Sequence, residues 1–456
     1  MLSLGYRKNK IFYTQLLTLM MPIVIQNFIS SSLNLVDNIM IGTLGESQIA
    51  AVGLANQVYF LMSLVLFGTF SGASIFVAQF WGSKSLEEIK KVLGLEMIFG
   101  VLLSTLFFIG SYFFTEQIFS ILSPDPLVIS IGSIYLKRVS LSFIPTAISF
   151  AFGFSTRSVG KATLPMYTSA VSLLVNTVLN YILIFGHFGF PAYGVLGAAT
   201  GTLIARFVEC IFMIVGIYRT IPELAIQAHH IFKPSLSLLK RVLKKAIPVI
   251  LNETFWSLGM IAYTIVYAKI GTNAAASVMI TNTVNNLFFV ISIGLGNATA
   301  ILLGNTLGAG EIDRAVEYNQ KLIALGLISG AVVGVVIFVL SSSIINAFYT
   351  LSPEAYLLTV NTFHVLAFYM PFKFYNTITI VGTLRSGGDT LFSMILELSC
   401  VWGIGVPMAV IGGLVWHLPV YFVVGLVSLE ELTKALVGIP RIRSRKWAQN
   451  LALERS

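Results

Sequence analysis

The chain has 456 residues, of which 56% are hydrophobic and only 10% are charged, and its formal net charge is +9. A soluble protein of this length could not cover its surface with so few charges, so a soluble globular domain is excluded. The excess of positive charge lies in short segments between long apolar runs, which argues against nucleic-acid binding and for an integral membrane protein.

Twelve apolar runs are each long enough to cross a bilayer as a helix, which takes about 20 residues. A helix satisfies its own backbone hydrogen bonds, and the strands of a membrane barrel are shorter than these runs. We therefore expect an all-α integral membrane protein. The predicted spans are residues 15–41, 50–76, 92–114, 130–155, 164–186, 193–217, 244–268, 275–303, 318–342, 357–384, 390–412 and 416–438.

The first predicted span carries a polar stripe. Asn27, Ser30, Asn34 and Asp37 follow helical spacing and therefore lie on one face of the helix. A carboxylate is costly inside a bilayer and usually faces a cavity or an ion path. We expect Asp37 to bind an ion, a cation or a proton, whose movement drives the protein's function. We expect Asn27 and Asn34 to line the same cavity.

Polar residues of the fifth and sixth spans reach a similar depth. At about 1.5 Å per residue, Asp37 and Asn180 lie roughly 7 and 9 Å below the outer ends of their spans, and Thr200 is comparable. Asn176 is one helical turn from Asn180 on the same face. Carboxylate, amide and hydroxyl oxygens could hold Na⁺, or Asp37 could carry a proton. The alternative is that the asparagines only tie helices together.

Lys and Arg occur in alternate loops, which is a topology signal. The positive-inside rule places both termini in the cytoplasm and requires an even number of spans, which twelve satisfies. The expected location is the inner (cytoplasmic) membrane. The predicted parts are an N-terminal six-helix lobe over residues 1–217, a cytoplasmic basic linker over 218–243, a C-terminal six-helix lobe over 244–438 and a cytoplasmic tail over 439–456.

The linker contains His229 and His230. We interpret this pair as a solvated loop rather than a metal site, because no other ligand is near in the sequence. No metal other than a possible Na⁺ is expected. Cys210 and Cys400 both fall inside predicted spans, so no disulfide framework is expected.

The two halves of the chain resemble each other at an offset of 226 residues. Six spans per half make both halves enter the membrane in the same direction, so the lobes should be related by a pseudo-two-fold axis along the membrane normal. Matching pairs include Pro22 with Pro248, Gly45 with Gly271, Asn56 with Asn282, Gly68 with Gly294, and Pro145 with Pro371.

In the second half, Glu253 aligns with Asn27 at the repeat offset. Lys373 lies within about 5 Å of the same depth along the normal. We expect Glu253 and Lys373 to face the second-lobe cavity, and we hypothesise that they pair, because pairing lowers the cost of each buried charge.

The other charged residues of the spans have structural interpretations. Arg206 and Glu209, three residues apart, are predicted to form a pair on the helix surface. Glu96, Glu430 and Glu431 are predicted near cytoplasmic helix ends, where an exposed carboxylate costs little. Glycines at 68/72, 197/201 and 326/330/334 have the small-xxx-small spacing that lets helices approach closely.

No catalytic or nucleotide-binding motif is present: the sequence has neither a Walker lysine loop nor HExxH. We therefore expect a transporter that is not an enzyme and that uses an ion gradient rather than ATP. It needs no cofactor beyond Na⁺ or H⁺ as coupling ion.

The chain resembles the multidrug and toxic compound extrusion (MATE) family of bacterial efflux transporters over almost its whole length. The segments that carry the resemblance are Pro22-Ile23-Val24, Val36-Asp37-Asn38-Ile39-Met40-Ile41-Gly42, Ile49-Ala50-Ala51-Val52-Gly53, Pro248 to Asn252-Glu253 with Trp256 and Gly259, Leu303-Gly304 to Leu307-Gly308-Ala309-Gly310, and Leu384-Arg385-Ser386-Gly387-Gly388-Asp389-Thr390.

The resemblance implies a Na⁺- or H⁺-driven antiporter that exports amphipathic, often cationic, drugs or metabolites. Asp37 matches the family's acid in the first span, Asn176 and Asn180 its polar pair in the fifth, and Glu253 its acid in the seventh. This chain has Asn180 where some members have Asp, and Lys373 where some carry an acid, which weakens a two-carboxylate site in the first half and a cation site in the second.

The runner-up function is a flippase or exporter of a lipid-linked or specific cell metabolite. A lipid-linked pyrophosphate would need a cavity rich in Arg and Lys, yet only Arg206 and Lys373 lie deep in the spans. This favours a neutral or cationic cargo. The expected partners are small amphipathic substrates, the coupling cation and the lipid bilayer, and the expected state is a monomer.

Overall fold

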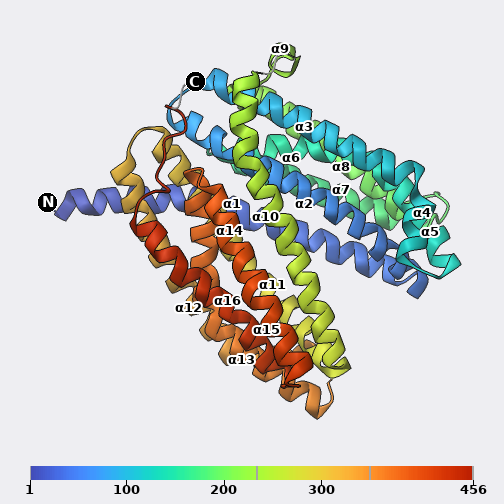
Figure 1. The fold of residues 1–456 in the computed structure, drawn as a ribbon. Helices are drawn as coiled ribbons and strands as arrows, with labels where there is room; N and C mark the ends of the chain where they lie inside the picture. The colour runs from blue at the N-terminus through green and yellow to red at the C-terminus, as the bar shows by residue number, and fades with distance from the viewer. Residues whose placement is uncertain (1, 233–234, 349–350, 454–456) are drawn as a thin grey trace. The chain divides into compact units, whose positions relative to one another are not determined.

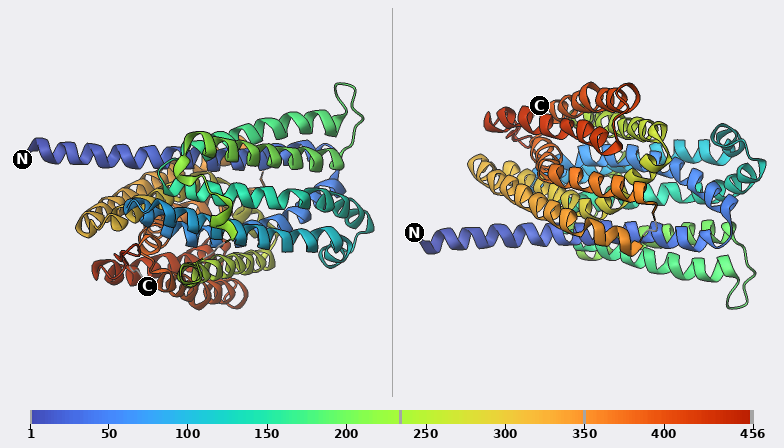
Figure 2. Two further views of the ribbon diagram at one scale, coloured as in Figure 1. Left: turned by 90° about the horizontal axis from the view of Figure 1, so that it is seen from above. Right: turned by 90° about the horizontal axis from the view of Figure 1, so that it is seen from below.

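A computed structural model describes residues 2–232, 235–348 and 351–453 (Figures 1 and 2). All regular structure in these ranges is helical. The α-helices are α1 Leu2–Gly42, α2 Glu46–Gly82, α3 Leu86–Phe113, α4 Thr115–Leu122, α5 Pro126–Val139, α6 Phe143–Ser158, α7 Thr163–Phe185, α8 Val195–Thr220, α9 Ala228–Phe232, α10 Leu236–Ile270, α11 Thr272–Gly308, α12 Ile312–Phe348, α13 Pro353–Asn376, α14 Thr390–Cys400, α15 Val406–Val410 and α16 Val420–Arg443.

Short helical segments of other geometry join some of these elements. Two are 3₁₀ turns, η1 Ser140–Ser142 and η2 Pro222–Leu224, and η1 joins α5 and α6 into one run. Three are π-helical: η3 Thr377–Leu384 continues α13, while η4 Val401–Gly405 and η5 Ile411–Val415 flank α15.

Ten helical runs in the described ranges are long and apolar enough to cross a membrane. They coincide with ten of the twelve predicted spans. The other two predicted spans, 357–384 and 416–438, coincide with α13 plus η3 and with α16. The latter is less apolar because Glu430, Glu431 and Lys434 lie in its middle.

The chain divides into two compact units, each described here by itself. The first unit is residues 21–250, and the second unit is the chain up to Met20 together with the chain from Leu251 onward. The divisions fall inside α1 and α10, not in the basic segment between α8 and α10. Figure 2 shows α1 as one unbroken helix.

Close helix contacts inside the first unit depend on glycine. A Cβ on Gly72 would overlap the Cα of Ala246 in α10, and one on Gly68 would meet the backbone of Ile250. On α8, Gly197 lies directly against the carbonyl of Leu183 in α7, the neighbouring helix in Figure 1. The predicted packing role of these glycines is therefore confirmed.

The second unit uses the same device between α12 and α13. A Cβ on Gly330 would meet the backbone of Pro371, and one on Gly334 would meet the carbonyl of Ala367. Beyond Pro371, α13 passes into η3, and this π-helical stretch leads to Arg385. The packing and the change of helix type set the direction in which Arg385 points.

Candidate functional site

Asp37 of α1 lies next to two asparagines of α7 in the first unit. Asn180 Nδ2 donates a hydrogen bond to Asp37 Oδ1 at 2.7 Å and another to Asn176 Oδ1 at 3.1 Å. Asn176 Nδ2 in turn donates to Thr202 Oγ1 on α8 at 3.2 Å. Both asparagines are 1% exposed. The structure thus joins three helices through one chain of hydrogen bonds that ends at the carboxylate.

The side-chain oxygen of Asn180 has no hydrogen-bond donor among the described residues. Asn180 Oδ1 is buried and accepts no hydrogen bond from the described residues. Its orientation is set by the network, because a flipped amide would place oxygen against two acceptors. Oδ1 lies against Gly201 of α8, at the place that a Cβ would occupy. An unpartnered amide oxygen therefore lies beside the Asp37 carboxylate.

Thr200 does not join this chain of hydrogen bonds. Its hydroxyl donates to the Leu196 carbonyl of its own helix at 2.8 Å, whereas Thr202 accepts from Asn176. The depth in the membrane that the sequence predicts does not distinguish Thr200 from Thr202, which are only two residues apart. Only the way that α7 packs on α8 selects Thr202, so no sequence signal would have identified it.

The predicted cavity residues of α1 have different outcomes. Asn27 Nδ2 is buried and has no hydrogen-bond partner among the described residues. Its neighbour Gln26, which the sequence analysis did not select, donates to Ser169 Oγ at 3.1 Å. The side chain of Asn34 lies outside the described residues, so its predicted role stays a prediction.

A second polar group adjoins the first. Arg206 Nη1 and Glu209 Oε2 are 2.8 Å apart, and Ser169 Oγ donates to Glu209 Oε1 at 3.2 Å. The predicted pair is confirmed, but its side chains are only 18% and 10% exposed, so it is mostly buried. Arg206 also interacts electrostatically with Asp37. With both acids ionised, Asp37 and Glu209 outnumber Arg206, and the group carries one negative charge.

In the second unit, the hypothesised pair of Glu253 and Lys373 is wrong. Glu253 Oε1 lies 2.6 Å from Arg385 Nη2, and the Arg385 side chain is 3% exposed. Lys373 Nζ instead lies 4.5 Å from the centre of the Phe289 ring. Depth along the normal does not determine the direction of a side chain around its helix, and beyond η3 it is Arg385 that faces α10.

The predicted exposure of Glu430 and Glu431 is also wrong. Glu430 is 6% exposed and accepts a hydrogen bond from the Tyr263 hydroxyl at 2.6 Å. Asn376 Nδ2 donates to Glu431 Oε2 at 2.6 Å. Lys434 Nζ lies 3.3 and 3.4 Å from the two carboxylates. The acids lie mid-helix in α16, where neighbouring helices cover them.

Glu96 has the same outcome in the first unit. It is 2% exposed, and Ser155 Oγ donates to its Oε2 at 2.7 Å, while Oε1 has no partner among the described residues. Glu397, which had no assigned partner, accepts from Asn252 Nδ2 at 2.6 Å. More acids are therefore covered than the predicted spans indicated. The helices continue beyond the predicted spans, so acids expected near a helix end lie well inside a helix.

The histidines of the linker have an acidic neighbour. His230 Nε2 lies 3.2 Å from Glu87 Oε2 of α3, and one ligand atom from each of Glu87, His229 and His230 falls within 4.8 Å of the others. The interpretation as a solvated loop assumed that no other ligand was near, and it is wrong for His230. His230 itself is buried, and its Nδ1 accepts a hydrogen bond from the Gln227 backbone, so it anchors α9 to α3.

Comparisons with known proteins cover nearly the whole chain. The family model described as MatE matches residues 22–182 and 248–411. The probable multidrug resistance protein YoeA of Bacillus subtilis is 28% identical over 393 residues, covering 86% of this chain and 84% of that protein. The multidrug resistance protein PmpM of Pseudomonas aeruginosa is 26% identical over 407 residues, covering 86% and 82%.

Solved structures share the fold. An outward-facing multidrug resistance MATE family transporter superposes with a TM-score of 0.85 at 20% identity, covering 95% of this chain and 96% of that one. A Vibrio cholerae MATE transporter gives a TM-score of 0.87 at 18% identity, covering 96% and 99%. The predicted fold class, an all-α membrane protein with twelve spans in two six-helix lobes, is confirmed.

Proposed function

The chain belongs to the MatE family of multipass membrane transporters, which are not enzymes, and from this premise we propose that it exports amphipathic, cationic compounds in exchange for Na⁺ or H⁺. Asp37 binds the coupling ion, and Asn176 and Asn180 hold the carboxylate in place. The protein acts as a monomer in the inner membrane, with both termini in the cytoplasm.

One observation carries the proposal: the polar group around Asp37 is one positive charge short. Arg206 bonds directly to Glu209, at 2.8 Å, and Asp37 has no direct cationic partner among the described residues. A half-buried carboxylate in this position is stabilised by gaining a proton or a cation. The exchange of that ion for a cationic substrate is the elementary step of antiport.

The donor atoms suit either ion. A proton needs only the Asp37 carboxylate. A Na⁺ ion needs several oxygens, and Asn180 Oδ1 and Thr202 Oγ1 supply neutral oxygens in the same network. Thr200 remains a proposed contributor through its hydroxyl oxygen.

The second unit has counter-charges of its own. Arg385 bonds to Glu253, and Lys434 lies between Glu430 and Glu431. Each of these acids has a direct cationic partner, although Glu430 and Glu431 share one, whereas Asp37 bonds only to an amide, so we assign coupling to the first unit. Glu253 and Lys373 are proposed to line the second cavity only.

The pairing of deep arginines with acids favours a neutral or cationic cargo. Arg206 and Arg385, two deep basic residues, are each bonded to an acid. A lipid-linked pyrophosphate would have to displace those acids, at the cost of leaving them buried and unpaired. The flippase alternative is therefore disfavoured.

The test is efflux of a fluorescent cationic dye from proteoliposomes, with Na⁺ and pH gradients imposed separately. We expect export by the wild type under one gradient and none by Asp37→Asn under either. Asp125→Asn is the matched control, because Asp125 caps α5 and its asparagine variant retains the cap. Absence of export by folded wild type under both gradients would overturn the proposal.

A further inference from the structure

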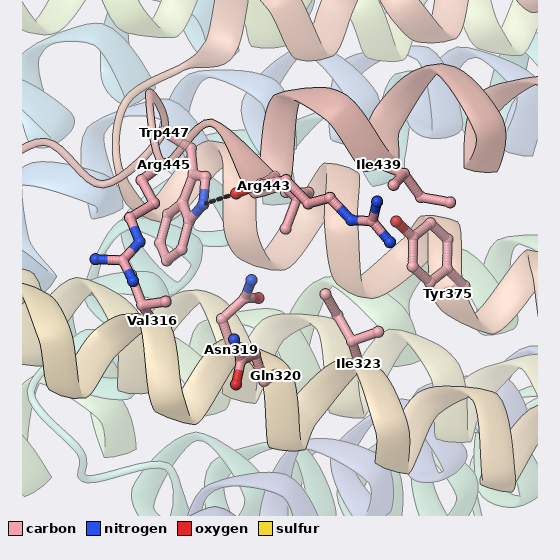
Figure 3. A pocket seen from close by; sticks show the side chains of 10 residues that line it. Val316, Asn319, Gln320, Ile323, Tyr375, Ile439, Arg443, Arg445 and Trp447 are labelled. Carbon is pink, nitrogen blue, oxygen red and sulfur yellow. Dashed lines mark hydrogen bonds between the residues drawn. The ribbon is translucent and has the colours of Figure 1, made fainter.

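A pocket of about 420 Å³ lies in the second unit (Figure 3). Its walls come from α12, the end of α13, the end of α16 and the tail that follows α16. The lining residues are Val316, Asn319, Gln320, Ile323, Tyr375, Ile439, Ile442, Arg443, Arg445 and Trp447.

The tail is held firmly as one wall of this pocket. Trp447 is 0% exposed, and its Nε1 donates to the Ile442 carbonyl at 3.2 Å. Its own carbonyl lies so close to Gly387 that any Cβ there would overlap it. In the last turn of α16, Arg441 binds Asp389 through two hydrogen bonds of 2.6 and 2.9 Å. The pocket is therefore built by packing and paired charges.

The pocket holds hydrogen-bond donors without matching acceptors. Asn319 is 2% exposed and uses Oδ1 to accept from Thr383 at 2.6 Å, while its Nδ2 has no partner among the described residues. Arg443 makes neither an ion pair nor a hydrogen bond with any described residue. Its guanidinium points toward the hydroxyl of Tyr375 in Figure 3.

Arg445 contributes a second guanidinium, whose ion pair with Asp313 is weak. Its Nη1 lies 3.2 Å from Asp313, but the two side chains are 58% and 96% exposed. A pair this exposed contributes little, so Arg445 can turn to another anion. Figure 3 shows the guanidinium of Arg443 beside Tyr375 and that of Arg445 at the opposite end of the pocket, with Asn319 between them. The guanidinium of Arg443 and the amide donor of Asn319 suit a phosphate, because a guanidinium binds phosphate oxygens in pairs.

The lining also includes four apolar side chains, those of Val316, Ile323, Ile439 and Ile442. A basic pocket between spanning helices, at the level where a helix leaves the membrane, suits the head group of an anionic phospholipid. The isoleucines would contact its glycerol and the start of its chains. A soluble phosphate ester has the same head-group chemistry without these chains.

We propose that this pocket binds a phosphate ester, held by Arg443 and the Nδ2 of Asn319, with Arg445 adding positive charge at the other end of the pocket. The site is independent of the export function and of Asp37. Its occupant ties the end of α16 to α12, because Arg443 belongs to α16 and Asn319 to α12.

The test is native mass spectrometry of the detergent-purified full chain titrated with phosphatidylglycerol, phosphatidylcholine or glycerol 3-phosphate. We expect phosphatidylglycerol to bind more tightly than phosphatidylcholine, and Arg443→Gln to weaken it about fivefold, the usual effect of one basic residue on an anionic lipid. The matched control is Lys446→Gln, which removes the same charge from an exposed tail residue outside the pocket.

The ligands distinguish the two sources of phosphate. Binding of phosphatidylglycerol alone identifies a lipid, and binding of glycerol 3-phosphate with equal strength identifies a soluble ester. No binding of either compound would overturn the proposal, as would an equal loss in Lys446→Gln and Arg443→Gln, which indicates diffuse attraction. The melting temperature of each variant checks its folding. These results do not depend on dye export, so the two proposals fail separately.

Discussion

Asn180 donates a hydrogen bond to Asp37 at 2.7 Å, while its own Oδ1 lies buried against Gly201 and accepts no hydrogen bond from any described residue. The Asn180 side chain therefore orients the Asp37 carboxylate through Nδ2, and its Oδ1 is an acceptor that a bound cation could use. A buried amide oxygen without a partner costs about 1–3 kcal/mol, and a bound cation would recover that cost.

The first prediction concerns the number of carboxylates. Asn180→Asp would place a second carboxylate at hydrogen-bond distance from Asp37, and two like charges this close cannot both stay ionised without a cation. We expect the variant to be stabilised by Na⁺ more strongly than the wild type. The measurement is the melting temperature as a function of Na⁺ at constant ionic strength. An identical Na⁺ response in both proteins would contradict the Na⁺ site.

The second prediction concerns the space beside the amide. Gly201→Ala would place a methyl group where Asn180 Oδ1 now lies, and relief of such an overlap typically costs about 1–3 kcal/mol. We expect a lower melting temperature and loss of dye export, because the amide must turn away from Asp37. The matched control is Gly53→Ala in α2, where a Cβ has nothing within 4 Å. Equal behaviour of the two variants would count against the arrangement.

The third prediction separates two threonines of α8. Thr202→Val removes the acceptor of the Asn176 hydrogen bond, and leaving that buried amide unpaired costs about 1–3 kcal/mol. Thr200→Val removes only a hydroxyl bonded to its own helix. We expect the melting temperature and the cation response to fall more in Thr202→Val. The reverse order would restore Thr200 to the site.

The fourth prediction concerns the pair of Glu253 and Arg385. Removal of one partner leaves a buried charge and costs about 3–5 kcal/mol, whereas removal of both can be nearly neutral. We expect Glu253→Gln to be strongly destabilised and the double variant with Arg385→Gln to recover part of the loss. A double-mutant cycle on chemical unfolding measures this coupling.

The control for this cycle is Lys373→Met combined with Glu253→Gln. Because Lys373 lies over Phe289 and not beside Glu253, we expect the two changes to be additive. Strong coupling between them would support the pairing that the structure contradicts.

Particular residues show where prediction from the sequence succeeds. The polar stripe ending at Asp37 follows from helical periodicity, and Asn176 and Asn180 share a face because they are four residues apart. The pairing of Arg206 with Glu209 is equally local. Each of these inferences needs only the geometry of one helix.

Other residues show where it fails. The partner of Asn176 proved to be Thr202. The partner of Glu253 proved to be Arg385, which follows a π-helical stretch that no sequence pattern predicted. Glu96 and Glu430 were expected to be exposed and are buried. In each case the outcome depends on how one helix is rotated against another.

The sequence by itself determined the membrane class, the twelve spans and the residues that carry charge inside them, because hydropathy and periodicity are properties of single segments. Only the tertiary structure decided which buried groups bond to one another and which, like Asn180 Oδ1, have no partner in the part of the chain that the structure describes. The physical reason is that a buried polar group must find its partner within about 3 Å. That distance is shorter than any uncertainty in depth or rotation that a sequence leaves open.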